Sequence, residues 1–125
     1  MPRPASVVTD AELSVLEFLW ERGPAVIREM ARGLYAANTP SYHATVNSLL
    51  DQLVTKGFVA RDRTGFAHVF SAKIDRSALV GKQLEHIAAS HFGGSLAPML
   101  LTLADKVKLN RRDREVLRKI VESIR

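Results

Sequence analysis

The sequence predicts a mainly α-helical protein with a small β-hairpin wing, arranged as a winged helix-turn-helix followed by a three-helix segment. An amphipathic helix over residues 41–56 ends at Gly57. Two short extended runs follow, residues 58–61 and 66–70, and the polar turn Asp62–Gly65 joins them. Later in the chain the pattern changes to three further helices, of which the middle one is apolar nearly all round. These three observations together predict the fold class.

The chain is long enough for one compact domain, or for a small domain with an appendage, since 46% of its 125 residues are hydrophobic. We expect a flexible arm over residues 1–8, a winged-helix domain over residues 9–73 and a C-terminal helical domain over residues 74–125. The absence of cysteine excludes disulfides and thiolate metal sites. No run approaches the roughly 20 apolar residues that span a bilayer, and residues 1–6 lack the apolar stretch of a signal peptide. We therefore expect a cytoplasmic protein without membrane contacts.

Two helices precede the amphipathic one. Thr9 is expected to cap the first helix, with Glu12 completing a capping box, and a Gly-Pro pair after Arg22 ends it. Residues 25–27 form a short extended piece that could pair with the edge of the hairpin. The second helix is expected from residue 27 to about residue 37.

The third helix, for which Ser41 is the expected cap, has two unlike faces. Its apolar stripe consists of Val46, Leu49, Leu50 and Leu53. Another face carries Tyr42, Thr45, Ser48 and Gln52, flanked by His43, Ala44 and Asn47. One face can therefore pack in the core while the other remains free to enter a groove. In the hairpin, the side chains expected in the core are Phe66, Val69 and Phe70.

A polar helix followed by a hairpin with arginines at its tip is the arrangement in which the helix reads the major groove of DNA and the hairpin contacts the backbone. We therefore interpret the protein as a DNA-binding transcriptional regulator. Base contacts are expected from Thr45, Asn47 and Ser48, and phosphate contacts from Arg61 and Arg63. Tyr42 is equally compatible with a phosphate contact and with packing at the helix start. His43 is equally compatible with a backbone contact and with a plain surface position.

The positive charge is unevenly distributed along the chain. The net charge is +5, yet residues 1–75 contain 8 Lys/Arg and 8 Asp/Glu, whereas residues 76–125 contain 10 and 5. Charge and motif therefore point to different parts of the molecule. We expect DNA binding at the winged-helix motif rather than at the basic C-terminal segment, because Ser, Thr and Asn read base edges without net charge. A neutral reading unit predicts modest affinity, so tight binding should need two units.

The C-terminal helices predict a homodimer. Asp75, Ser95 and Asn110 are the expected caps of helices that end near Phe92, Ala104 and Arg125. Three helices in about 50 residues cannot enclose a middle helix that is apolar on all sides, and a second copy of the segment would cover it. We therefore expect an obligate dimer with two-fold symmetry. The expected dimerisation residues are Val80, Leu84, Ile87, Leu96, Met99, Leu100, Leu103, Leu117, Ile120, Val121 and Ile124.

Five segments, in order and spacing, resemble one known family. They are Leu13–Pro24, Val26–Met30, Thr45–Leu53, Lys56–Val59 and Phe92–Ser95. The chain resembles the penicillinase-repressor and methicillin-resistance-repressor (BlaI/MecI) family of bacterial winged-helix regulators. The resemblance implies a homodimer with interlocking C-terminal helices that binds a palindromic operator in double-stranded DNA and represses transcription. It also implies that Ala44, Thr45, Asn47 and Ser48 face DNA, while Arg61, Arg63 and Thr64 lie in the wing.

Departures from the family pattern bear on specificity and induction. Ala44 stands where the family usually has lysine or threonine, and Asn47 stands where it often has arginine, so a different operator is expected. The best-known members are inactivated by cleavage of an Asn-Phe bond, and this chain has no Asn-Phe dipeptide. Copper-responsive relatives use cysteines in the tail, which are absent here. The sequence identifies neither an inducing signal nor an upstream sensor or protease.

The tail also carries a basic cluster, which comprises Lys106, Lys108, Arg111, Arg112, Arg114, Arg118 and Lys119. We interpret it as the charged outer face of a dimer-forming helix rather than as a nucleic-acid site. His86 and His91 have poor spacing for a metal site, and the sequence shows neither a nucleophile constellation nor a glycine-rich phosphate loop, so we expect no metal, cofactor or catalysis. The rival functions are a winged-helix protein-interaction module and a ligand-gated sensor with a pocket between the tail helices.

Overall fold

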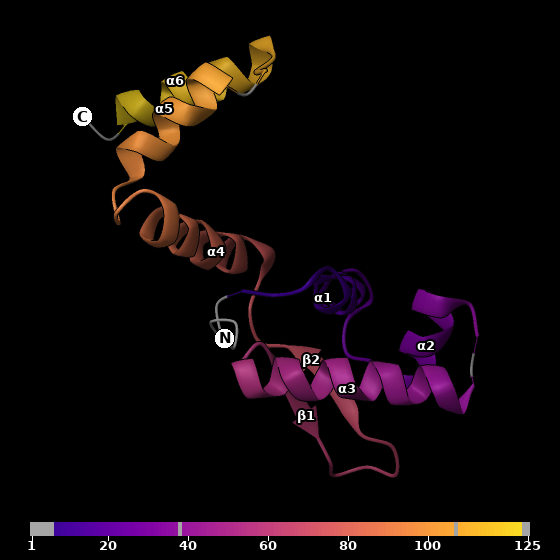
Figure 1. The fold of residues 1–125 in the computed structure, drawn as a ribbon. Helices are drawn as coiled ribbons and strands as arrows, with labels where there is room; N and C mark the ends of the chain where they lie inside the picture. Colours follow the sequence, from indigo (N-terminus) through magenta and orange to yellow (C-terminus); the bar gives the residue numbers. More distant parts are fainter. Residues whose placement is uncertain (1–6, 38, 107, 124–125) are drawn as a thin grey trace. The chain divides into compact units, whose positions relative to one another are not determined.

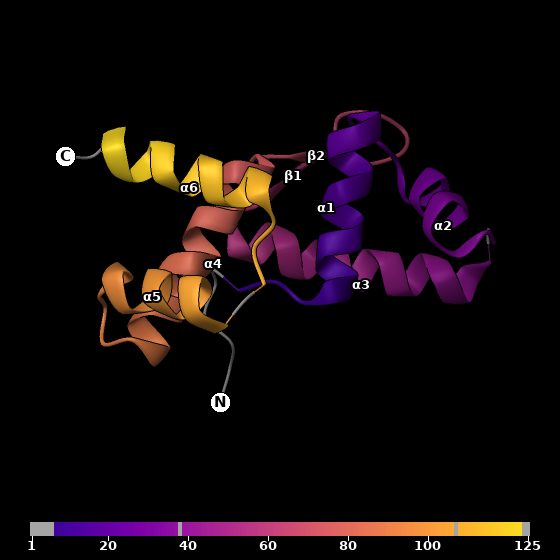
Figure 2. The same cartoon turned by 90° about the horizontal axis from the view of Figure 1, so that it is seen from above.

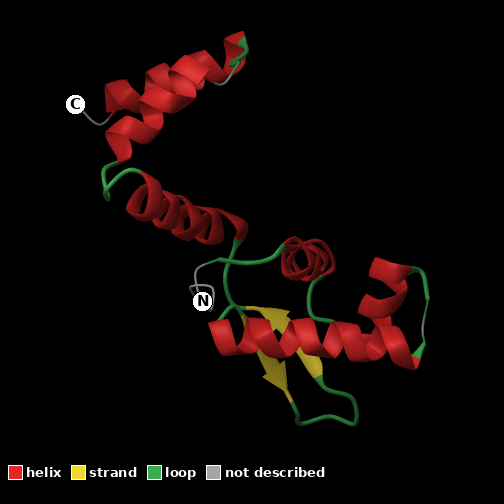
Figure 3. Cartoon of the chain, viewed as in Figure 1, coloured by secondary structure: helices red, strands yellow, loops and turns green. Residues whose placement is uncertain are grey.

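The computed structural model describes residues 7–37, 39–106 and 108–123. The elements are α1 (Asp10–Arg22), α2 (Ile27–Tyr35), α3 (Pro40–Lys56), β1 (Val59–Asp62), β2 (Val69–Ala72), α4 (Arg76–His91), α5 (Leu96–Lys106) and α6 (Arg111–Ser123) (Figures 1 and 3). The predicted fold class, mainly helical with a two-stranded antiparallel hairpin, is confirmed. Residues 1–6 of the predicted arm, and Ile124 of the predicted dimerisation set, lie outside the described residues.

The chain divides into two compact units, and the division falls inside α4, between Leu84 and Glu85. The first turns of α4 belong to the N-terminal unit. Leu79 is completely buried in the core of that unit, and Gln83 Oε1 accepts a hydrogen bond from the backbone N–H of Val8 at 3.4 Å. The fourth helix therefore begins as part of the winged-helix unit.

The winged-helix unit is built around α1 and α3. The predicted capping box of α1 is present, because Thr9 Oγ1 accepts from the Glu12 N–H at 3.1 Å and the Glu12 carboxylate accepts from the Thr9 N–H at 2.8 Å. Figure 1 shows α1 end-on and Figure 2 shows it lengthwise, so that it crosses α3. The side chains with no exposed surface at this core include Val15, Leu16, Met30, Val46, Leu50, Leu53, Phe70 and Leu79.

The hairpin is tied to the segment between α1 and α2. β1 and β2 pair antiparallel with Arg61 opposite Phe70 and Asp62 opposite Val69. Ala25 forms a bridge to Phe70, with the Ala25 N–H donating to the Phe70 carbonyl at 3.0 Å and the Phe70 N–H donating back at 2.8 Å. The predicted pairing of residues 25–27 with the hairpin edge is thereby confirmed at Ala25.

The second strand lies later in the sequence than predicted. It begins at Val69, not at Phe66, because the register with β1 ends at the pair Asp62 and Val69. Residues 63–68 therefore form a loop outside the sheet. The prediction that Phe66 lies in the core is wrong, since its side chain is fully exposed, whereas Phe70 is completely buried as expected.

The start of α3 also differs from the prediction. Thr39 caps the helix in place of Ser41, because its Oγ1 accepts from the Tyr42 N–H at 3.3 Å. Pro40 occupies the first turn, where a missing N–H costs nothing and the fixed φ favours the helix. The preceding helix α2 stops at Tyr35 because Ala36 adopts a left-handed conformation with a φ of 55°.

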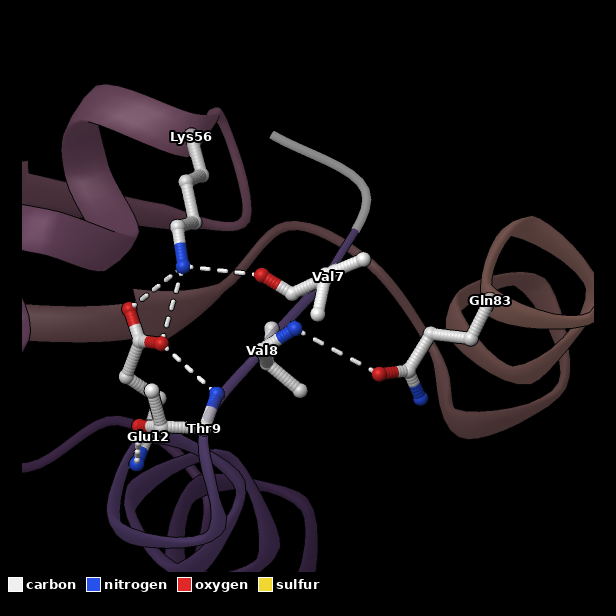
Figure 4. A network of polar contacts seen from close by, with 6 residues as sticks. All are labelled: Val7, Val8, Thr9, Glu12, Lys56 and Gln83. Carbon is white, nitrogen blue, oxygen red and sulfur yellow. Dashed lines mark hydrogen bonds and ion pairs between the residues drawn. The ribbon is translucent and has the colours of Figure 1, made fainter. Parts of the chain in front are cut away.

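A buried ion pair connects the end of α3 to the start of α1 (Figure 4). The Lys56 ammonium donates to both carboxylate oxygens of Glu12, at 2.8 and 2.9 Å, and to the Val7 carbonyl at 2.8 Å. Glu12 has no exposed surface. Burial would raise the pKa of its carboxyl, but the hydrogen bonds from Lys56 and Thr9 and the charge of Lys56 hold that pKa below its ordinary value. Glu12 is therefore a charged link between two helices.

The caps predicted for the helices α4 and α6 are present. Asp75 Oδ1 accepts from the Ala78 N–H at 2.7 Å at the start of α4, and Asn110 Oδ1 accepts from the Asp113 N–H at 2.8 Å at the start of α6.

No helix among the described residues is by itself long and apolar enough to cross a membrane. The helices α4 and α5 would meet that length and composition only together, with a 94° bend at the break between them.

Candidate nucleic-acid interface

The outward face of α3 carries small polar side chains, as the sequence predicts. Val46, Leu50 and Leu53 are completely buried, whereas Thr45 and Ser48 are exposed. Residues three and four apart share a helix face, so the buried stripe and the polar stripe arise from the same 3.6-residue period. The helix is therefore anchored on one side and offers hydroxyl groups on the other.

Ala44 and Thr45 are exposed in the N-terminal half of α3. Thr45 Oγ1 donates to the Ser41 carbonyl at 3.1 Å. A hydroxyl has one hydrogen and two lone pairs, so this bond uses its donor and leaves acceptor capacity facing outward. The methyl groups of Ala44 and Thr45 add an apolar surface of the kind that contacts the thymine methyl in a major groove.

The first turn of α3 is held by an aromatic stack. Tyr42 packs against Tyr35 of α2 with ring centroids 4.7 Å apart and planes 13° from parallel. Its side chain is 37% exposed, so one edge remains at the surface. The structure thus shows the packing role that the sequence allowed for Tyr42. His43, the next residue, is half-buried.

Arg61 does not extend freely into solvent. Its Nη2 donates to Asp51 Oδ1 at 2.8 Å and to Asn47 Oδ1 at 3.2 Å, both on α3. Its guanidinium lies 4.8 Å from the centroid of the Phe70 ring, and its side chain is 17% exposed. Arg61 and Asn47, predicted separately as phosphate and base contacts, are therefore brought together in one cluster.

The wing begins with a turn closed by Asp62. One carboxylate oxygen accepts from the Thr64 hydroxyl at 2.7 Å and from the Thr64 N–H at 2.9 Å. These two hydrogen bonds hold the pKa of Asp62 below its ordinary value. Arg63 and Thr64 are exposed, and Arg63 forms no ion pair with any described residue. Its charge remains available to a phosphate group.

Sequence reasoning missed several neighbours of this surface. A shallow, mostly apolar hollow joins α2, α3 and the wing, and is lined by Val26, Ile27, Arg28, His43, Phe66, Ala67 and His68. Asp51 could have been found from the sequence, because it lies four residues after Asn47 on one helix face. Arg28 and Phe66 could not, because only the later start of β2 places the wing loop beside the start of α2.

The predicted dimerisation residues form a separate apolar set. Val80, Leu84, Ile87, Leu96, Leu100 and Ile120 are between 39% and 53% exposed. Met99, Leu103 and Leu117 are half-buried, and no residue of α5 is fully buried. The side chain of Val121 is outside the described part of the structure. Among the described residues, no group of three His, Cys, Asp or Glu side chains is placed to hold a metal ion.

The fold and this polar surface define a winged-helix DNA-binding protein. The chain belongs to the penicillinase repressor family, which matches it over residues 8–123. It is 24% identical to the penicillinase repressor of Bacillus licheniformis over 115 residues, which is 92% of this chain and 89% of that protein. The family consists of DNA-binding transcriptional repressors and is not a class of enzymes. The resemblance drawn from the sequence is thereby confirmed.

Proposed function

We propose that this protein is a homodimeric repressor in which each copy inserts α3 into a major groove of a palindromic operator. The observation that carries the proposal is the polar outer face of α3, with Thr45 and Ser48 exposed on a helix whose opposite side is buried. Arg63 and Thr64, exposed beside it in the wing, supply the backbone contact. Repression then follows from occupancy of the operator.

The exposed apolar side chains of α4, α5 and α6 support the dimer. Six of the predicted dimerisation side chains are at least 39% exposed in one copy of the chain. Soluble monomers seldom leave so much apolar surface uncovered, and each Å² removed from water contributes about 25 cal/mol. A second copy would cover these residues, and two-fold symmetry would match a palindromic site.

Binding through two copies of the winged-helix unit also compensates for the low net charge of each one. Residues 1–75 contain equal numbers of basic and acidic residues, 8 of each, so phosphate attraction to one unit is small. Linking two weak units raises the apparent affinity by about 10²- to 10⁴-fold through effective concentration. A cytoplasmic dimer on two half-sites is therefore the form expected to act.

The decisive experiment is footprinting on the DNA just upstream of the gene that encodes this protein, because repressors of this kind commonly control neighbouring genes. Labelled duplexes are then titrated at two salt concentrations. We expect a symmetric protected site, sequence preference at both ionic strengths, and a dimer bound per site. A protein-interaction module would instead show no preference among duplexes at either salt concentration.

A further inference from the structure

Arg61 of β1 makes three different contacts, two with α3 and one with Phe70 of the neighbouring strand β2. The Nη2 atom binds Asp51 Oδ1 at 2.8 Å and Asn47 Oδ1 at 3.2 Å, and the guanidinium lies 4.8 Å from the Phe70 ring centroid. The Nε atom is buried and has no hydrogen-bond partner among the described residues. The side chain is therefore held in one place by a carboxylate, an amide and an aromatic ring.

This contact decides which way the side-chain amide of Asn47 faces. A guanidinium has only donors, so the atom that meets it must be the carbonyl oxygen of Asn47. The NH₂ group then lies on the other branch of the amide. Rotating the amide by half a turn would place its NH₂ against the guanidinium, donor against donor. An asparagine without such a neighbour could adopt either orientation.

We propose that Arg61 is a positioning residue for base reading, which fixes the Asn47 amide so that its NH₂ group is offered to the major groove. The proposal rests on the proposed function, in which α3 occupies that groove. Purine N7, guanine O6 and thymine O4 accept hydrogen bonds there, whereas cytosine presents its amino donor. A fixed NH₂ therefore selects against cytosine at the base that faces Asn47. The Asn47 carbonyl retains a second lone pair, so adenine remains compatible.

Arg61 and Arg63 differ in how far their charges are compensated and exposed. Its charge is compensated by Asp51 at 2.8 Å and its side chain is only 17% exposed, whereas Arg63 is exposed in the wing. Removing Arg61 should therefore cost base preference more than general affinity for DNA. Removing Arg63 should do the reverse. The two arginines thus form a matched pair of variants.

The test uses the full-length protein and an operator selected by it from a pool of random duplexes. Binding is measured on a panel of duplexes with each base pair of one half-site changed in turn. We expect the wild type to disfavour cytosine at one position by about tenfold. Arg61→Met should reduce that ratio to less than about twofold, as should Asn47→Ala. The double variant should lose no more preference than either single variant.

Two controls separate positioning from a structural role. Arg63→Met should weaken binding to every duplex by the same factor and keep the base ratio. In the free protein, the NMR relaxation of the Asn47 side-chain NH₂ should be that of a rigid group in the wild type and of a mobile group in Arg61→Met. This second measurement needs no DNA. It also holds if the variant loses some stability, because both proteins are observed folded.

Each remaining outcome counts against a definite part of the proposal. If Arg61→Met keeps the wild-type base ratio, or weakens all duplexes equally, Arg61 does not position Asn47 for reading, and the repressor function stands. If the wild-type amide is already mobile in the free protein, the positioning is wrong whatever the DNA results. If the wild type prefers no duplex at all, the proposed function itself fails, and the reading role of Asn47 fails with it.

Discussion

At the scale of single residues, Thr45 offers the simplest test of α3 as the reading helix. Thr45→Val keeps the shape and removes the hydroxyl, which is exposed and already donates to the Ser41 carbonyl. Removal of one base contact costs about 1–3 kcal/mol, or about 5- to 150-fold in Kd for the operator. Thr55→Val, exposed near the other end of α3, is the control and should leave Kd unchanged. Equal effects of both substitutions would contradict the assignment.

Arg63 tests the wing separately, through the dependence of binding on salt. Arg63→Met removes an exposed charge without an ion pair among the described residues. Operator and random duplexes should lose affinity alike, and the slope of log K against log salt should become smaller by about 0.9 for each phosphate that the variant no longer neutralises. Lys82→Met, an exposed charge on α4, serves for comparison. An unchanged slope would show that the wing does not contact the backbone.

The lowered pKa of Glu12 predicts how the stability of the fold depends on pH. The folded protein holds the pKa of its carboxyl below the ordinary value of 4.5, so the charged form stabilises the fold above that pH, and the stabilisation is lost as the pH falls through the folded pKa. Glu12→Gln leaves the Lys56 ammonium without its carboxylate and should lower the free energy of unfolding at pH 7 by about 1–3 kcal/mol. Urea titrations of the wild type and of Glu12→Gln between pH 7 and pH 3 measure this difference in the free energy of unfolding.

The difference between wild type and Glu12→Gln should shrink on acidification, because both side chains are then neutral. Glu21→Gln on the exposed side of α1 controls for loss of one negative charge and should change stability by less than about 0.5 kcal/mol. A constant difference at all pH values would mean that Glu12 is not ionised in the folded protein.

At the scale of elements, the start of α3 allows a direct comparison of two neighbouring hydroxyl residues. Thr39 caps the helix through its bond to the Tyr42 N–H, so Thr39→Ala should lower the free energy of unfolding by about 1 kcal/mol. Ser41→Ala, within the first turn, should change it by less than about 0.5 kcal/mol. Thermal melts of the two variants decide between them, and a larger loss for Ser41→Ala would restore Ser41 as the cap.

Most of the helices could be predicted from the sequence because they carry a periodic pattern of apolar residues; α5, which is apolar nearly all round, is the exception. In α3 the spacing of Val46, Leu50 and Leu53 indicates both the helix and its buried side, and all three are completely buried. The same local pattern located Thr45 and Ser48 on the opposite face. Local spacing therefore suffices for element type and for which side faces outward.

The hairpin register could not be predicted in this way. Phe66 and Phe70 are equally apolar in the sequence, yet one is fully exposed and the other completely buried. The difference is set by the pairing of Asp62 with Val69 and by the bridge from Ala25, 45 positions before Phe70. The contacts of Arg61 with Asn47, and of Lys56 with Glu12, depend on the same long-range packing. The sequence indicated that residues 25–27 could pair with the hairpin edge, but not that Ala25 meets Phe70.

At the scale of the whole molecule, we expect operator affinity to depend on the proposed dimer. Leu100 on α5 is 43% exposed in one copy of the chain. Leu100→Lys would place a charge in the proposed interface and should yield monomers in sedimentation velocity, with operator affinity reduced by about a hundredfold or more. Thr102→Lys adds the same charge to the same helix at an exposed polar position and should remain dimeric. A folded wild-type monomer would contradict the proposed assembly.

Trp20 is the chain's only tryptophan, and its surroundings make it an intrinsic reporter. Its indole N–H donates to the Ile74 carbonyl at 2.8 Å, and the Arg76 guanidinium lies 4.7 Å from the ring centroid. All tryptophan fluorescence of the protein therefore arises where α1 meets the residues that lead into α4. If operator binding loosens that junction, the emission will shift to longer wavelength without any attached dye, and the native protein can be followed in real time.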